Sequence, residues 1–148
     1  MYQKLLTSLQ ALHRAHTRFT DLWLKQVGLN RLQLTILFAL YQQGECTLNE
    51  LTALLQENQG NVSRFSKQLA ERGEVQRAKA PHDERCTLLS LTPAGVAFCE
   101  ARFVEVQELF EMSDADLEAL IEAQGQTIRR LQMATNKLEA RNVRTEKA

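Results

Sequence analysis

The sequence predicts a mainly α-helical fold that carries one small β-hairpin. Apolar residues recur at helical spacing through most of the chain, N-cap residues precede these stretches, and one segment alone loses the helical period. In that segment, 74–91, short runs containing Val75 and Leu89 flank a turn with Pro81. The 148 residues, 44% of them hydrophobic, suffice for a core without metal or disulfide staples. A single domain over 1–148 is therefore expected.

The N-cap residues set the order of the helices. A side-chain oxygen of Asn, Ser or Thr accepts from a free backbone N–H at a helix start, and Glu or Gln three residues later completes a capping box. The predicted order is helix, helix, short helix, helix, hairpin and two long helices. Two short helices followed directly by a hairpin indicate a winged helix-turn-helix. The predicted caps are Asn30 with Gln33, Thr47 with Glu50, Asn58, Thr92 before Pro93, and Ser113.

Charge is balanced over the chain but segregated along it. Eighteen Lys and Arg residues oppose eighteen Asp and Glu residues, so the net charge of zero does not indicate a polyanionic partner. Residues 64–85 hold six basic and four acidic side chains, a surplus of two, whereas 111–122 form an acidic block. Binding to nucleic acid must therefore come from a local patch.

The fourth helix is expected to expose hydrogen-bonding side chains opposite its core side. At about 100° per residue, Val62, Phe65 and Leu69 share the core side. Arg pairs with guanine, Asn and Gln pair with adenine, and Ser and Lys reach phosphates. An ordinary solvated helix surface is also polar, so this face alone does not decide between DNA and solvent. The predicted DNA-binding residues of this helix are Asn61, Ser63, Arg64, Lys67 and Gln68.

The hairpin adds to the case for DNA binding. Its charged tip, PHDER, has little to contribute to a core, and Arg85 there is predicted to reach a phosphate or the minor groove. Arg77, on the first strand, is expected to pair with Asp83 across the hairpin. This ion pair would shape the wing without touching DNA. Its value would be geometric, because exposed ion pairs contribute little to stability.

In these segments the chain resembles the MarR (multiple antibiotic resistance regulator) family of bacterial winged-helix repressors. The resemblance covers 29–95 by motif and the flanking helices by order and length. It implies a homodimer built from helices at 1–27 and 96–142, with a winged helix-turn-helix lobe at 29–95 that binds a pseudopalindromic operator. Residues 143–148 are expected to form a disordered tail. The matching pieces are LNRLQ (29–33), TLNEL (47–51), NVSR (61–64), VQR (75–77), DER (83–85) and LTPAG (91–95).

Three residues depart from the family pattern. Glu74 stands where an apolar residue is usual, Glu84 places an acid at the wing tip, and Asn30 replaces a threonine cap. Because the two acids would weaken attraction to phosphate, moderate DNA affinity is expected.

Apolar stripes at both ends of the chain would serve the dimerisation that the resemblance implies, because such faces must be buried somewhere. The resemblance also implies release from DNA by a small aromatic, phenolic or oxidant signal. His13 and His16 are candidates for an effector pocket, although histidines satisfied within a dimer interface are the simpler interpretation. The stripes consist of Leu5, Leu9, Leu12, His16, Phe19 and Trp23, and of Leu117, Leu120, Ile121, Ile128, Leu131 and Leu138.

Two other functions stay open. Cys86 lies beside Arg85 and His82, an electropositive setting in which its pKa is expected to fall, so a thiol-based redox regulator is one alternative. The other is a winged helix that binds only proteins, which would need an apolar face on the fourth helix.

No enzymatic motif occurs in the chain, so neither catalysis nor a cofactor or metal is expected. The three cysteines are odd in number and form no C-x-x-C pattern, which indicates reduced thiols. No apolar run is long enough to span a membrane, and the first residues lack a signal-peptide core. A cytoplasmic protein with no membrane partner is therefore expected.

Overall fold

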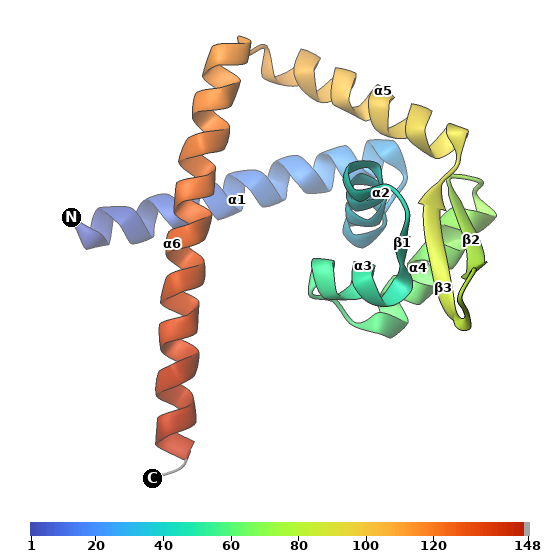
Figure 1. The fold of residues 1–148 in the computed structure, drawn as a ribbon. Helices are drawn as coiled ribbons and strands as arrows, with labels where there is room; N and C mark the ends of the chain where they lie inside the picture. The colour runs from blue at the N-terminus through green and yellow to red at the C-terminus, as the bar shows by residue number, and fades with distance from the viewer. Residues whose placement is uncertain (147–148) are drawn as a thin grey trace. The chain divides into compact units, whose positions relative to one another are not determined.

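The fold is mainly helical with a small antiparallel sheet, which confirms the predicted class. The computed structural model describes residues 1–146, with side chains described to residue 142. The chain divides into two compact units, Met1–Phe103 and Val104–Ala148. The elements are α1 (Tyr2–Val27), α2 (Arg31–Gln43), β1 (Cys46–Thr47), α3 (Leu48–Leu55), α4 (Gln59–Glu71), β2 (Val75–Ala80), β3 (Asp83–Leu91), α5 (Pro93–Phe110) and α6 (Asp114–Glu146) (Figure 1).

All five predicted helix caps are confirmed by hydrogen bonds. Asn30 Oδ1 accepts from the backbone N–H of Gln33 at 2.8 Å, and Gln33 Oε1 accepts from the N–H of Asn30 at 3.0 Å. Thr47 and Glu50 form the same reciprocal box, and the hydrogen bond from the Thr47 N–H lowers the pKa of the Glu50 carboxyl. The remaining caps join Asn58 to Asn61, Thr92 to Gly95, and Ser113 to Asp116.

The sheet has three strands in the order β1-β3-β2, all antiparallel. The hairpin β2–β3 confirms the predicted wing, but β1 was not predicted. It pairs Cys46 with Leu89 and Thr47 with Leu88. A strand of two residues is too short to show an alternating pattern, so its only sequence signal is the cap of the helix that follows it.

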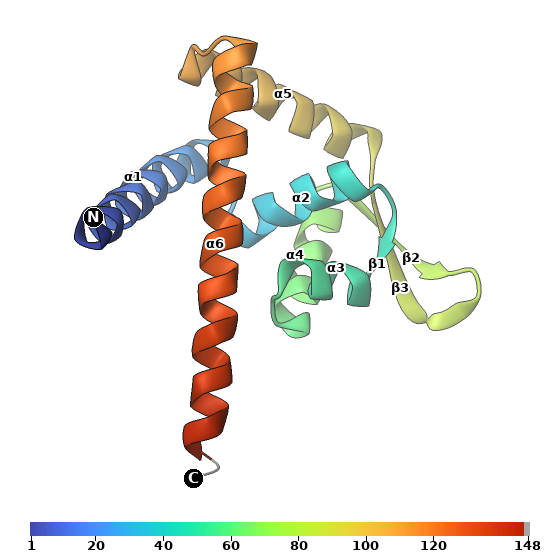
Figure 2. The same cartoon turned by 60° about the vertical axis from the view of Figure 1, so that its left-hand side comes forward.

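The core lies in the first unit, where α2, α3 and α4 lie together and the hairpin extends away from them (Figure 2). Cys99 of α5 is one of its members, and burial raises the pKa of its thiol to about 11. This thiol donates to the carbonyl oxygen of Leu37 at 3.8 Å, so it acts as a packing residue. The side chains exposed by at most 1% are Ile36, Leu37, Leu40, Leu51, Val62, Ser66, Leu69, Leu89 and Cys99.

The start of β2 packs against the start of α5. A Cβ atom added to Gly95 would lie 2.0 Å from the Glu74 carbonyl oxygen, so only glycine fits there. The same carbonyl accepts from the Thr92 backbone N–H at 3.0 Å, and Thr92 Oγ1 donates to the carbonyl of Gly73 at 2.6 Å. These contacts fix the root of the wing against the helices.

Glu74 has a partner that the sequence did not reveal. The residue is 8% exposed, and both of its carboxylate oxygens accept from the Arg72 guanidinium, at 3.0 and 3.1 Å. Arg72 also donates from Nη1 to the carbonyl oxygen of Gly28 at 3.1 Å, at the end of α1. The pair neutralises Glu74 and Arg72 together, and the expectation that Glu74 weakens attraction to phosphate stays a prediction.

The second unit consists of the end of α5 and α6, and no described side chain from Val104 to Asn142 is buried. The helix α6 continues to Glu146, and residues 147–148 lie outside the described part, so the disordered tail at 143–148 stays a prediction. The predicted domain boundaries stay predictions. Exposed apolar residues of the α6 stripe are Leu117, Ile121, Ile128, Leu131 and Leu138.

The stripe on α1 differs between its two halves. Trp23 is buried, and its ring lies 5.9 Å from that of Phe19 and 6.3 Å from that of Phe38. Leu5 and Leu12, in the first half, are each 51% exposed. Only the second half of α1 therefore packs against the first unit's core. None of the helices described is long and apolar enough to cross a membrane.

Candidate nucleic-acid interface

The core side of α4 consists of Val62, Ser66 and Leu69, all fully buried. Phe65, predicted to share that side, is only half-buried, and the Arg64 guanidinium lies over its ring at 4.5 Å from the centroid. Ser66 takes the predicted place of Phe65 in the core. Because serine is smaller than phenylalanine, it leaves space on the core side of α4 for the Arg77 side chain, which donates to Ser66 Oγ.

The exposed face of α4 is polar, as predicted. Asn61, Arg64, Lys67 and Gln68 are exposed, whereas Ser63 is half-buried. Arg64 Nη2 lies 3.5 Å from Asn61 Oδ1, a long contact that aligns the guanidinium along the first turns of the helix. The amino-terminal half of α4 thus displays an arginine and an amide side by side, and Lys67 and Gln68 follow one turn later.

Arg77 ties the wing to α4 instead of pairing with Asp83. Its Nη1 donates to the carbonyl oxygen of Ser63 at 3.1 Å and makes a short hydrogen bond to Ser66 Oγ. The predicted ion pair is wrong because the strand register separates its members: Arg77 lies opposite Leu89, whereas Asp83 lies opposite Ala80 at the far end of the hairpin.

A bulge displays the residues of the wing tip. Lys79 pairs with Thr87 but Ala80 pairs with Asp83, so residues 84–86 of β3 have no partner on β2. The Asp83 carboxylate accepts from the backbone N–H of Arg85 at 2.9 Å and closes the local turn. Asp83 therefore shapes the wing as expected, but through the backbone of Arg85. The Arg85 side chain itself is exposed.

The setting of Cys86 opposes thiolate formation. Its thiol donates to Asp83 Oδ2 at 3.5 Å. This hydrogen bond, with desolvation and the negative charges of Asp83 and Glu50, raises the pKa of the Cys86 thiol. The expectation of a lowered pKa is wrong, because the nearby carboxylate outweighs the adjacent cations.

Basic side chains at this surface are left without carboxylate partners. Arg31 pairs with Asp21 and Arg72 pairs with Glu74, both at 3.0 Å. No carboxylate among the described side chains pairs with Arg64, Lys67, Arg77 or Arg85. Five basic side chains oppose Glu71, Asp83 and Glu84 in α4 and the wing, so this surface carries a surplus of two positive charges although the whole chain is neutral.

One further polar contact joins α4 to α2. Gln33 Nε2 donates to Gln68 Oε1 at 2.9 Å, and the Gln33 side chain is 8% exposed. Sequence reasoning assigned Gln33 only to the helix cap and missed this contact, as it missed the partner of Arg77. Both contacts join residues far apart in the chain, and helical periodicity carries no signal for them.

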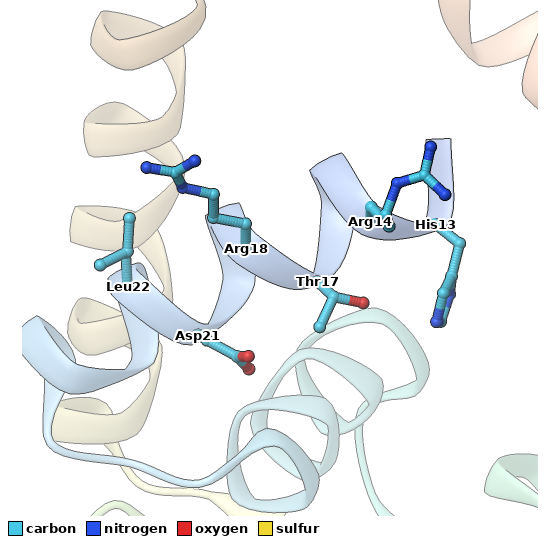
Figure 3. Close-up of a pocket in the computed structure, with 6 residues that line it drawn as sticks. All are labelled: His13, Arg14, Thr17, Arg18, Asp21 and Leu22. Carbon is cyan, nitrogen blue, oxygen red and sulfur yellow. The ribbon is translucent and has the colours of Figure 1, made fainter. Parts of the chain in front are cut away.

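The predicted effector residues lie on α1, where a shallow hollow of about 460 Å³ occurs. Figure 3 shows its six lining residues, all from α1; His13 is one of them and His16 is not. No group of three or more metal-ligating side chains occurs in the described residues. An effector site at His13 and His16 stays a prediction.

Comparisons with known proteins agree with this architecture. The model of the MarR family matches residues 29–87. The chain is 28% identical over 123 residues to the HTH-type transcriptional repressor IacR of Pseudomonas putida, covering 81% of this chain and 72% of that protein.

Solved structures extend the match over most of the chain. A probable transcriptional regulator from Pseudomonas aeruginosa is 30% identical, with a TM-score of 0.61 over 78% of this chain and 92% of that one. A MarR mutant from E. coli, complexed with operator DNA, is 25% identical, with a TM-score of 0.60 over 82% and 96% of the two chains. Family model, relatives and fold agree, and the chain belongs to the MarR family of transcriptional regulators.

Proposed function

We propose that this protein is a homodimeric, sequence-specific DNA-binding repressor that acts on a pseudopalindromic operator. The observation that carries the proposal is the positive surface of α4 and the wing. Arg64, Lys67 and Arg85 are exposed there, and no described carboxylate pairs with them. Unpaired cations beside exposed amides match what a duplex offers, namely phosphate oxygens and base edges. The operator complex of the E. coli relative supports the same role.

Residues of α4 and the wing have defined parts in this proposal. Arg64 and Asn61, at the amino-terminal half of α4, contact base edges in the major groove. Lys67 and Ser63 contact phosphates and hold the helix in register. Arg85, displayed by the bulge in β3, reaches the flanking backbone or the minor groove.

The homodimer is supported by the exposed apolar stripes. Leu5 and Leu12 on α1, and residues such as Ile121 and Ile128 on α6, are at least half exposed in the single chain. Large apolar faces of this kind are buried in a partner interface when one exists. A two-fold axis then presents two copies of α4 to half-sites about 10 base pairs apart.

The test is selection of bound sequences from random duplex DNA with the full chain, combined with light scattering. Enrichment of a two-fold symmetric sequence by a dimer is the expected result. In vitro transcription from a promoter that carries the selected site then measures repression. Binding without sequence enrichment, or a monomer on DNA, contradicts the proposal.

A protein-only winged helix is less well supported, because α4 exposes polar and charged residues and no apolar face. A redox regulator that depends on Cys86 is also less well supported, because Asp83 raises the pKa of the thiol. Operator binding measured with and without peroxide, for the wild type and Cys86→Ser, separates this alternative. The redox alternative requires that peroxide changes operator binding of the wild type and leaves that of Cys86→Ser unchanged.

A further inference from the structure

We propose that Gln68 donates a hydrogen bond to an acceptor on a base edge, and that Gln33 is the positioning residue that fixes the orientation of the Gln68 amide. The inference rests on the proposed DNA-binding function and adds the chemical preference of one position in the operator. The acceptors concerned are guanine O6 and N7 and thymine O4.

The orientation of Gln33 is set by the cap of α2. Its Oε1 accepts from the backbone N–H of Asn30 at 3.0 Å, so its Nε2 must point the other way. The side chain is 8% exposed, which leaves it little room to turn over in solvent. A local backbone feature, the capping box, therefore determines which end of this amide faces α4.

The orientation of the Gln33 amide determines the orientation of the Gln68 amide. Gln33 Nε2 donates to Gln68 Oε1 at 2.9 Å, so the carbonyl end of the Gln68 amide is held toward α2. The Nε2 group of Gln68, with two N–H donors, remains for an external partner. Gln68 is exposed and lies four residues after Arg64, on the same side of α4.

A fixed donor distinguishes bases in a way that a free glutamine does not. A free amide pairs with adenine by turning both its oxygen and its nitrogen to the same base. Here the oxygen is directed to Gln33, which disfavours that arrangement. Guanine and thymine present only acceptors in the major groove, whereas adenine places its N6 donor beside the N7 acceptor and cytosine presents a donor at N4. We expect one operator position in each half-site to prefer guanine or thymine because of Gln68.

The decisive variant is Gln33→Glu. A glutamate oxygen accepts from the Asn30 N–H as the glutamine oxygen does, so the capping box is retained. The carboxylate has no donor, and it attracts the Gln68 Nε2, which turns the Gln68 oxygen outward. Sequence selection with this variant should change the preference at one position from guanine or thymine to cytosine or adenine, by about tenfold.

Two further variants, both at position 68, test the proposal even if Gln33→Glu does not fold. In Gln68→Glu, at an exposed site, the carboxylate still accepts from Gln33 but presents an acceptor to DNA, so cytosine should be preferred at the same position. Gln68→Met should remove the preference there and leave the others unchanged. Gln42→Glu, at an exposed site of α2, is the control for added negative charge and should weaken binding without changing any base preference.

The outcomes separate this inference from the proposed function. If the wild type enriches no sequence, the proposed function fails. If the wild type enriches an operator but the position 33 and 68 variants weaken all sequences equally, Gln68 contacts a phosphate, and recognition of a base is overturned. An unchanged binding profile in Gln68→Met also overturns it. A preference that inverts in both glutamate variants supports it.

Discussion

The two parts of the proposed DNA surface, α4 and the wing tip, are held in place by different means. Side chains of α4 have partners from distant elements: Gln68 contacts Gln33 of α2, and Ser66 contacts Arg77 of β2. Arg85 at the wing tip is displayed only by its own strand, through the Asp83 turn and the bulge. Long-range contacts fix an orientation, whereas a local turn fixes only a position. The first arrangement suits base recognition, and the second suits phosphate attraction.

The largest expected effect is that of Arg77→Met, which removes the hydrogen bonds that join the wing to α4. Loss of these bonds to Ser63 and Ser66 should lower the free energy of unfolding by about 2 to 3 kcal/mol. Urea unfolding measures this loss. Lys79→Met, a charge removed from an exposed site of the same strand, should be nearly neutral. Equal stability of both variants would contradict the role of Arg77.

Arg64→Ala tests the helix as the specific part. Loss of a bidentate contact to a base should cost about 2 kcal/mol with the selected operator and little with random DNA. Fluorescence anisotropy with both duplexes, at one salt concentration, measures the difference. An equal loss on both duplexes would show that Arg64 contacts phosphate only.

Arg85→Ala tests the wing as the non-specific part. It should weaken binding to all sequences by a smaller amount and flatten the plot of log affinity against log salt by about one unit. The salt series is best run on the same two duplexes as for Arg64→Ala. A loss confined to the selected operator would assign base recognition to the wing as well.

The smallest effect concerns the turn at Asp83. Because the Asp83 carboxylate raises the pKa of the Cys86 thiol, Asp83→Asn should lower that pKa toward its ordinary value. At a fixed pH below the pKa the variant then holds more thiolate, and alkylation of Cys86 should be faster. Iodoacetamide labelling across a pH series measures this shift. Cys46→Ser in the same background removes the other partly exposed thiol.

The sequence was sufficient for features that depend on neighbouring residues. The capping boxes at Asn30 and Thr47 follow from residues three apart, and the hairpin follows from the loss of helical period. Features that depend on register or on long-range contacts were missed. The partners of Arg77 lie on α4, more than ten residues away in the chain, and Ser66 was not expected in the core because buried positions are usually apolar.

The bulge in β3 has a consequence for how this protein can change in evolution. Residues 84–86 have no partner on β2, so chain can be added or removed there without altering the pairing of Arg77 with Leu89 nearer the core. The length of the wing tip is thus free to vary while the root of the wing stays fixed. A longer tip would reach farther along a duplex, so relatives with insertions at these three positions should have longer footprints on DNA. Glu84 is exposed, its side chain has no hydrogen bond or ion pair with the described residues, and it lies in this stretch.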